Sequence, residues 1–153
     1  MSTFTASATQ LAYVMRTTSS SWDFSGAVQG IYGGGNPRVG AMNFPTIRNV
    51  DWSRQIVNSI QLRLTFMAAG SNTGKTVYLY QGAKSSISGT GQSMIGASMG
   101  SFSSNGDAYN ATRTISFSSS SNASIFTNLV SWLTSGAATT LVIYRDEADG
   151  GDW

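Results

Sequence analysis

Residues 56–80, IVNSIQLRLTFMAAGSNTGKTVYLY, contain the clearest structural signal in the chain. Apolar side chains recur at every second position from Ile60 to Phe66, and polar side chains fill the positions between them. This alternation is typical of a strand with one face on a core and the other in water. Turn-forming residues follow over residues 68–74, and alternation resumes over residues 76–80. The pattern predicts two strands joined as a hairpin, with the first strand at the centre of a sheet.

The composition favours short strands over long helices. Of the 153 residues, 41% are hydrophobic and only 10% are charged, whereas roughly a quarter of the residues are charged in an average protein. Serine, threonine and glycine fill many of the remaining positions, which suits strands and small loops. The content of aromatic and β-branched residues is too high for a disordered chain. The length predicts one domain over residues 1–153.

The residues that the chain lacks disfavour several functional classes. The net charge of +2 and the scattering of the nine basic residues predict no nucleic-acid partner. The absence of cysteine and histidine removes disulfides, thiolates, the commonest metal ligand and the commonest general base. No signal-peptide pattern opens the sequence, and no apolar run approaches about 18 residues. We therefore expect a protein that is made in the cytoplasm and does not insert into a membrane.

The remaining segments predict an all-β protein with one short helix. Strand patterns occur at residues 9–17, 38–44, 92–98, 113–118 and 139–145. The last of these is apolar on both faces, which predicts a central strand. Over residues 122–134 the apolar residues fall on one helical face, so we expect a helix there that begins at a Ser121 or Asn122 cap. The expected fold is an antiparallel β-sandwich of the jelly-roll type.

Four quoted segments carry a resemblance to known domains: SIQLRL (59–64), KTVYLY (75–80), LVSWLTSG (129–136) and TLVIY (140–144). Together they resemble jelly-roll modules of the carbohydrate-binding-module type. More narrowly, they are similar to DNRLRE-type β-sandwich domains of surface proteins and to tail or capsid proteins of phages and prophages. The resemblance covers residues 56–152. It implies a binding or structural role and no catalytic activity.

The resemblance also implies a strand that the sequence does not contain. Such modules close with a further strand after an acidic, glycine-rich loop, but this sequence stops at Trp153. Either the chain is truncated or its last strand is supplied differently. In both cases an exposed sheet edge would favour pairing with a neighbouring subunit.

Aromatic side chains are the main candidates for a binding surface, because flat rings stack on sugars and fill interface pockets. The alternation of residues 77–80 places Tyr78 and Tyr80 on the face opposite Val77 and Leu79. Trp132 lies beside the apolar stripe of the expected helix and is predicted to be core. The candidate binding residues are Trp22, Tyr32, Trp52, Tyr78, Tyr80 and Tyr109.

The C-terminal stretch DEADGGD contains the candidate metal ligands. Closely spaced carboxylates with glycines can wrap a hard cation, so calcium is the expected ion if any is bound. The alternative is a solvated acidic turn. The candidate ligands are Asp146, Glu147, Asp149 and Asp152.

Two short motifs look catalytic but lack the structure that the chemistry needs. Residues 69–76, AGSNTGKT, resemble a phosphate-binding loop, yet a strand follows where that loop needs a helix. Residues 96–100, GASMG, match a nucleophile elbow, but the chain has no histidine to serve as base. We read both as turns or loops and expect no catalytic residues.

These observations favour a non-enzymatic phage virion protein, either a capsid decoration protein or a tail or fibre component. Its expected partners are other copies of itself, other virion proteins and host surface glycans, and its expected location is the virion. The alternative is a carbohydrate-binding or adhesive module of a larger secreted bacterial protein, located outside the cell or at its surface. An enzyme is the least favoured class.

Overall fold

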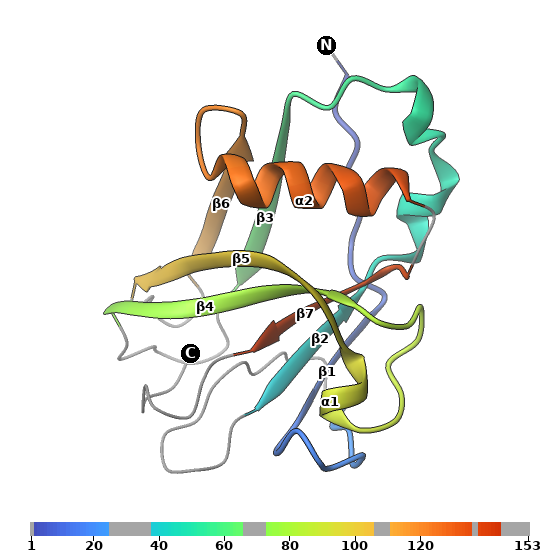
Figure 1. The fold of residues 1–153 in the computed structure, drawn as a ribbon, viewed down its shortest axis with the longest axis vertical. Helices are drawn as coiled ribbons and strands as arrows, with labels where there is room; N and C mark the ends of the chain where they lie inside the picture. The colour runs from blue at the N-terminus through green and yellow to red at the C-terminus, as the bar shows by residue number, and fades with distance from the viewer. Residues whose placement is uncertain (1, 25–37, 66–72, 106–110, 136–137, 145–153) are drawn as a thin grey trace.

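The computed structural model describes residues 2–24, 38–65, 73–105, 111–135 and 138–144. Within these residues the chain forms two antiparallel sheets and one long helix, which confirms the predicted all-β sandwich (Figure 1). The strands are β1 (Gln10–Val14), β2 (Val39–Asn43), β3 (Ser59–Thr65), β4 (Thr73–Gly82), β5 (Ile95–Asn105), β6 (Thr112–Ser118) and β7 (Thr140–Tyr144). The helices are α1 (Gly91–Met94), α2 (Ala123–Thr134) and the 3-10 turns η1 (Pro45–Asn49) and η2 (Trp52–Arg54).

The larger sheet has the strand order β1-β2-β7-β4-β5, with β7 at its centre. β7 pairs antiparallel with β2 on one side and with β4 on the other. Its first four residues are buried, so side chains that point to opposite faces are all removed from water. The prediction of a central strand at residues 139–145 is confirmed. The physical reason is also the expected one, because a strand that is apolar on both faces is buried on both faces.

The predicted hairpin between residues 60–66 and 76–80 is wrong. β3 pairs with β6 in a separate two-stranded sheet, while β4 pairs with β5 and β7 in the larger sheet. The β3–β6 register places Ile60 opposite Phe117 and Leu62 opposite Ile115, so apolar side chains face each other across both pairs. β3 is therefore an edge strand and not the centre of a sheet.

β5 runs through residues that the sequence indicated to be loop. It begins at Ile95, contains the GASMG motif and continues to Asn105. Gly100, with φ of +122°, lies against α2, and a Cβ at this position would be 2.7 Å from Cγ1 of Ile125. A glycine is needed here for both the backbone conformation and the close approach of the helix. Gly100, which the composition assigned to a loop, therefore lies within strand β5.

The larger sheet is buried on both faces. On one face it meets α2, β3 and β6 in the main core, to which Val77, Leu79 and Phe117 belong. On the other face a second cluster lies beneath Ile87 and α1. Its buried members are Ala12, Val14, Val39, Ala41, Ile87, Met94 and Val142. In a simple sandwich this second face of the larger sheet would be exposed to water. Here Ile87 and α1 cover part of it.

The helix α2 confirms the predicted element at residues 122–134, but its N-terminus differs from the expected cap. Asn122 occupies the N-cap position in a left-handed conformation, and its side chain makes no capping bond. Its Nδ2 instead donates to the carbonyl of Ser116 on β6. At the other end, Nη1 of Arg48 donates to the carbonyl of Leu133 at 2.7 Å, and desolvation lowers the pKa of Arg48.

Trp132 is a core residue, as predicted. Its side chain is 5% exposed, and its Nε1 donates to the carbonyl of Ala138 at 2.7 Å. The ring therefore packs α2 onto the sheet and also fixes the chain just before β7.

Replacing Trp132 by alanine tests this anchoring. We expect the free energy of unfolding to fall by about 3–5 kcal/mol, because a large buried ring is lost and the carbonyl of Ala138 keeps only its hydrogen bond from Arg48. Denaturant unfolding followed by circular dichroism measures the loss. Val130→Ala on the same helix is the matched control and should cost less than about 1.5 kcal/mol, because Val130 is half exposed. Equal losses in the two variants would contradict the placement of Trp132.

Candidate functional site

The two tryptophans that were candidates for binding act as structural anchors. Nε1 of Trp22 donates to the carbonyl of Gly89 at 2.7 Å, and Nε1 of Trp52 donates to the carbonyl of Ile47 at 2.6 Å. Phe4 meets the Trp52 ring edge-on, with centroids 5.4 Å apart. Both rings are partly buried, and both indole donors are occupied by the protein itself. These contacts give both indoles a structural partner, and binding at Trp22 and Trp52 stays a prediction.

The tyrosines of β4 lie as the alternation predicts, opposite the buried Val77 and Leu79. Tyr80 packs against the second cluster, together with Tyr144 of β7. Tyr144 is the cross-strand neighbour of Tyr78 and is likewise half buried. The structure thus groups three tyrosines, one of which the sequence analysis did not single out. The other two candidates, Tyr32 and Tyr109, lie outside the described residues.

The predicted metal ligands Asp146, Glu147, Asp149 and Asp152 also lie outside the described residues. Within the described part of the chain, no three acidic side chains come together in a way that could hold a metal ion. In the same residues, no helix is long and apolar enough to cross a membrane.

Lys84, in the loop before α1, forms a hydrogen-bonded contact with Ser93 of α1. Nζ of Lys84 donates to Oγ of Ser93 at 3.2 Å and to the carbonyl of Ser88 at 3.1 Å. Oγ of Ser93 in turn donates to the carbonyl of Thr90 at 2.8 Å. The pair holds the loop before α1 in place.

Three of the four sheet edges are capped within the described residues. At β1, the backbone of Tyr13 exchanges two hydrogen bonds with the backbone of Asp23, at 3.1 and 2.8 Å. The Asp23 carboxylate also accepts a hydrogen bond from the Tyr13 hydroxyl, which is the largest cause of the raised pKa of Tyr13. The guanidinium of Arg38 lies 5.4 Å from the centroid of the same ring. This edge is closed by backbone and side chains together.

The edges at β5 and β6 are closed by side-chain donors. Nδ2 of Asn128 on α2 donates to the carbonyl of Met99 at 3.0 Å, and Nη2 of Arg113 donates to the carbonyl of Ser103 at 2.6 Å. On β6, Asn122 donates to the carbonyl of Ser116. Such donors occupy acceptors that another strand would need, so they protect an edge from pairing.

The fourth edge, on β3, has no such cap. Apart from its ladder with β6, the strand makes one described hydrogen bond, between the hydroxyls of Thr65 and Thr112. The apolar side chains of β3 are also less buried than those of its partner. Ile60, Leu62 and Leu64 are half buried, whereas Ile115 and Phe117 on β6 are 6% and 0% exposed. The layer is therefore incomplete on the β3 side.

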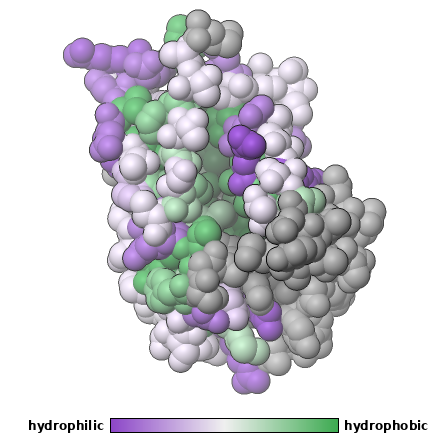
Figure 2. Space-filling model, turned by 180° about the vertical axis from the view of Figure 1, so that it is seen from behind, coloured by the Kyte–Doolittle hydropathy of each residue, from purple (hydrophilic) through white to green (hydrophobic). Residues whose placement is uncertain are grey.

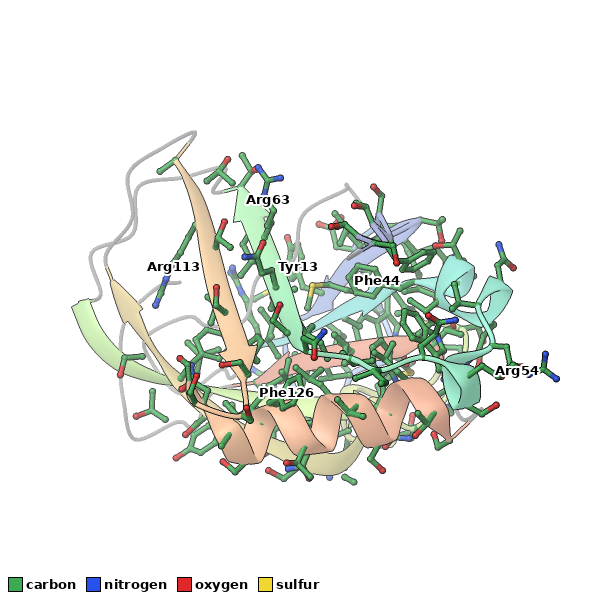
Figure 3. The ribbon with its side chains drawn as sticks, turned by 90° about the horizontal axis from the view of Figure 1, so that it is seen from above. Tyr13, Phe44, Arg54, Arg63, Arg113 and Phe126 are labelled. Atoms are coloured by element: carbon green, nitrogen blue, oxygen red, sulfur yellow. The ribbon has the colours of Figure 1, made fainter. Side chains whose placement is uncertain are left out.

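A hydrophobic hollow lies beside this open edge. Figure 2 shows it between the N-terminal segment and β3 on the rear face of the molecule. In the view from above, Phe44 lies between β3 and β1 (Figure 3). We call the open edge and these neighbours the β3 groove. Its apolar members, which pack against the main core but stay partly exposed, are Leu11, Phe44, Ile60, Leu62 and Leu64.

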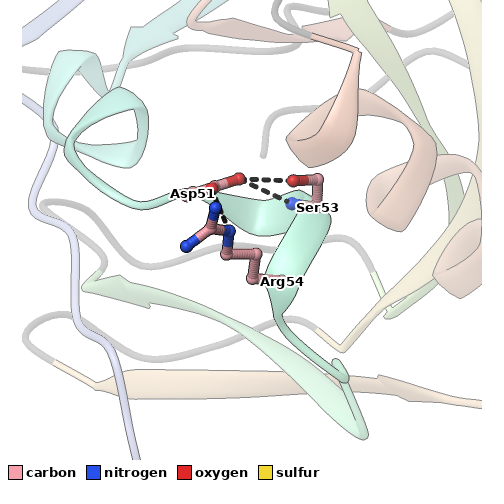
Figure 4. Close-up of polar contacts among 3 residues, drawn as sticks. All are labelled: Asp51, Ser53 and Arg54. Atoms are coloured by element: carbon pink, nitrogen blue, oxygen red, sulfur yellow. Dashed lines mark hydrogen bonds and ion pairs between the residues drawn. The ribbon is translucent and has the colours of Figure 1, made fainter.

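The β3 strand itself carries a single charge, which is positive. Arg63 is the one ionisable residue of β3, and among the described residues it has no ion-pair partner. Arg54, on η2, forms an ion pair with Asp51, with 3.2 Å between Nε and Oδ2 (Figure 4). Asp51 also accepts hydrogen bonds from the amide and hydroxyl of Ser53.

The sequence analysis did not identify the groove. It took the alternating residues 60–66 to lie at the centre of a sheet, where both edges are paired. Leu11 and Phe44 belong to segments with their own strand patterns, and nothing local indicates that they approach β3. The alternation of residues 60–66 was the available signal. It predicts which face of the strand is buried, but it does not predict which strand pairs with it or which edge stays open.

Asn128→Ala tests the closure of the β5 edge. We expect a loss of about 1 kcal/mol in the free energy of unfolding, because the carbonyl of Met99 loses its donor. Amide hydrogen exchange should accelerate in β5. Thr127→Ala is the matched control, since the Thr127 hydroxyl bonds only within the helix, to the carbonyl of Ala123. Unchanged exchange in β5 would contradict the capping role.

The comparison with known proteins gives no family for this fold and groove. No family model, curated protein sequence or solved structure matches this chain. The resemblance to phage and DNRLRE-type domains therefore stays a prediction, and the function has to be argued from the groove itself.

Proposed function

We propose that this chain is a non-enzymatic structural protein of a phage particle, where it binds neighbouring virion subunits. The observation that carries the proposal is the open edge of β3 beside partly exposed apolar side chains. An unpaired strand with an apolar face is a template for pairing with another chain. The resemblance seen in the sequence supports the choice of a phage particle.

The energetics favour a partner at this position. Fully burying an aliphatic side chain contributes about 1.5–3 kcal/mol relative to leaving it exposed. Ile60, Leu62 and Leu64 are half buried in the isolated chain, so roughly half of that contribution is missing for each. A subunit that covers the β3 groove would supply it together with backbone hydrogen bonds.

Carbohydrate binding is the second candidate function, because Tyr78 and Tyr144 are half-buried neighbours on one face of the sheet. Adjacent rings can stack on a sugar. A glycan array probed with the wild type and with Tyr78→Ala tests it. Glycan binding that is lost in Tyr78→Ala and kept in Gln61→Ala, a change on β3, would favour this function over the first.

The phage-particle function makes a direct prediction about where the protein is found. Particles released from the bacterium that encodes the chain are purified on a density gradient and probed with an antibody raised against the purified protein. We expect the chain to sediment with the particles at a fixed ratio to the major capsid protein, measured by mass spectrometry. Recovery of the chain only from particle-free culture medium would contradict the proposal and favour a secreted module.

A further inference from the structure

We propose that the β3 groove receives an extended strand donated by a different protein, with apolar residues at alternate positions and acidic residues between them. The inference rests on the proposed function in that the donor is a neighbouring subunit. It adds the position of the contact, the backbone conformation of the partner and the chemistry of the partner's side chains.

The backbone beside the groove favours a strand over a helix or a loop. β3 presents seven residues in extended conformation, and their outer edge has no described partner. On the other side of the hollow, residues 2–8 make no described backbone hydrogen bond before Thr9 donates to the carbonyl of Asn43. A strand laid next to β3 would find unpaired backbone groups on β3 and on the N-terminal segment, which is the geometry of strand addition.

The floor of the groove selects apolar residues at every second position. Ile60, Leu62 and Leu64 point to the core side of β3, and Gln61 and Arg63 point away from it. A paired strand has the same period, so every second side chain of the added strand would face the main core, against which Ile60, Leu62 and Leu64 already pack. The main core would then be covered on the β3 side as it already is on the β6 side.

The outer face of the groove selects acidic residues. Arg63 is the one charged side chain of β3, and it lies at the end of the strand, away from the core (Figure 3). A residue opposite Arg63 on an added strand is its cross-strand neighbour, where opposite charges attract and like charges repel.

A second copy of the chain does not fit the groove. β1 and β2 lie on the side of β3 where the next strand would be added (Figure 3). Antiparallel pairing of two β3 strands puts both larger sheets on the same side of the joined layer, where they would occupy the same space. A separate extended segment does not meet this obstacle.

Peptide binding to the purified chain tests the inference. The probe is a blocked nine-residue peptide in which valine and glutamate alternate. The controls are a peptide of the same composition with all valines in one block and a peptide with lysine in place of glutamate. We expect the alternating acidic peptide to bind more tightly than the lysine peptide by roughly threefold to tenfold. Its binding should slow amide exchange within β3.

Three variants locate the contact. Leu62→Lys should weaken the acidic peptide by at least about tenfold because it places a charge on the apolar floor, while Gln61→Lys on the outer face should keep binding. Arg63→Glu should reverse the preference between the glutamate and lysine peptides, and Arg54→Glu, outside the strand, should not. Circular dichroism shows that each variant is folded.

The result that would overturn the inference is equally specific. It fails if the alternating peptide binds no better than the block peptide, if exchange slows elsewhere and not in β3, or if folded Leu62→Lys binds as well as the wild type. A stable multimer of the pure chain that dissociates in Leu62→Lys would show that a second copy fills the groove, which also contradicts it. Recovery of the chain in phage particles is a separate result, so either proposal can fail alone.

Discussion

The burial of β7 on both faces is the constraint on which the rest of the structure depends. Leu141 and Ile143 point into the main core, and Val142 points into the second cluster. The polar residues that precede them are satisfied, since the Thr140 hydroxyl donates to the carbonyl of Lys84 and the Thr139 hydroxyl donates to Asn43. Two hydrophobic layers can therefore assemble against one sheet, with β2 and β4 placed on either side of β7.

Elements with a local signal could be predicted from the sequence, and elements that depend on the choice of partner could not. The apolar run of β7, the stripe of α2 and the opposite orientations of Val77 and Tyr78 follow from the period of a single segment. The pairing of β3 does not, because any strand with the same alternation is an equally good partner by pattern. β3 pairs with β6 and not with β4, because β4 already has β5 on one side and β7 on the other. The sequence of a single segment does not show which strands flank it.

The candidate site differs from the predicted one for the same reason, because its residues are brought together only by the tertiary structure. Aromatic residues attracted attention by type, yet the Trp22 and Trp52 indoles bond to carbonyls of the protein. The residues that define the groove are ordinary in sequence: leucines in a strand, a phenylalanine before a turn and one arginine. The residues that cap the other edges, such as Asn128 on β5 and Asp23 on β1, are polar residues that a sequence reader would assign to the surface. Only their distances to a strand edge reveal what they do.

The capped edges of the two sheets matter for function as much as the open edge of β3 does. A protein with every edge open would aggregate, and one with every edge closed would have no strand to offer. Among the described residues, asparagine, arginine and backbone donors close three edges, and the fourth carries the exposed Arg63 near the end of β3. A charge on an edge strand discourages pairing with an uncharged or basic strand. Arg63 therefore limits indiscriminate association and, by the same electrostatics, admits an acidic strand.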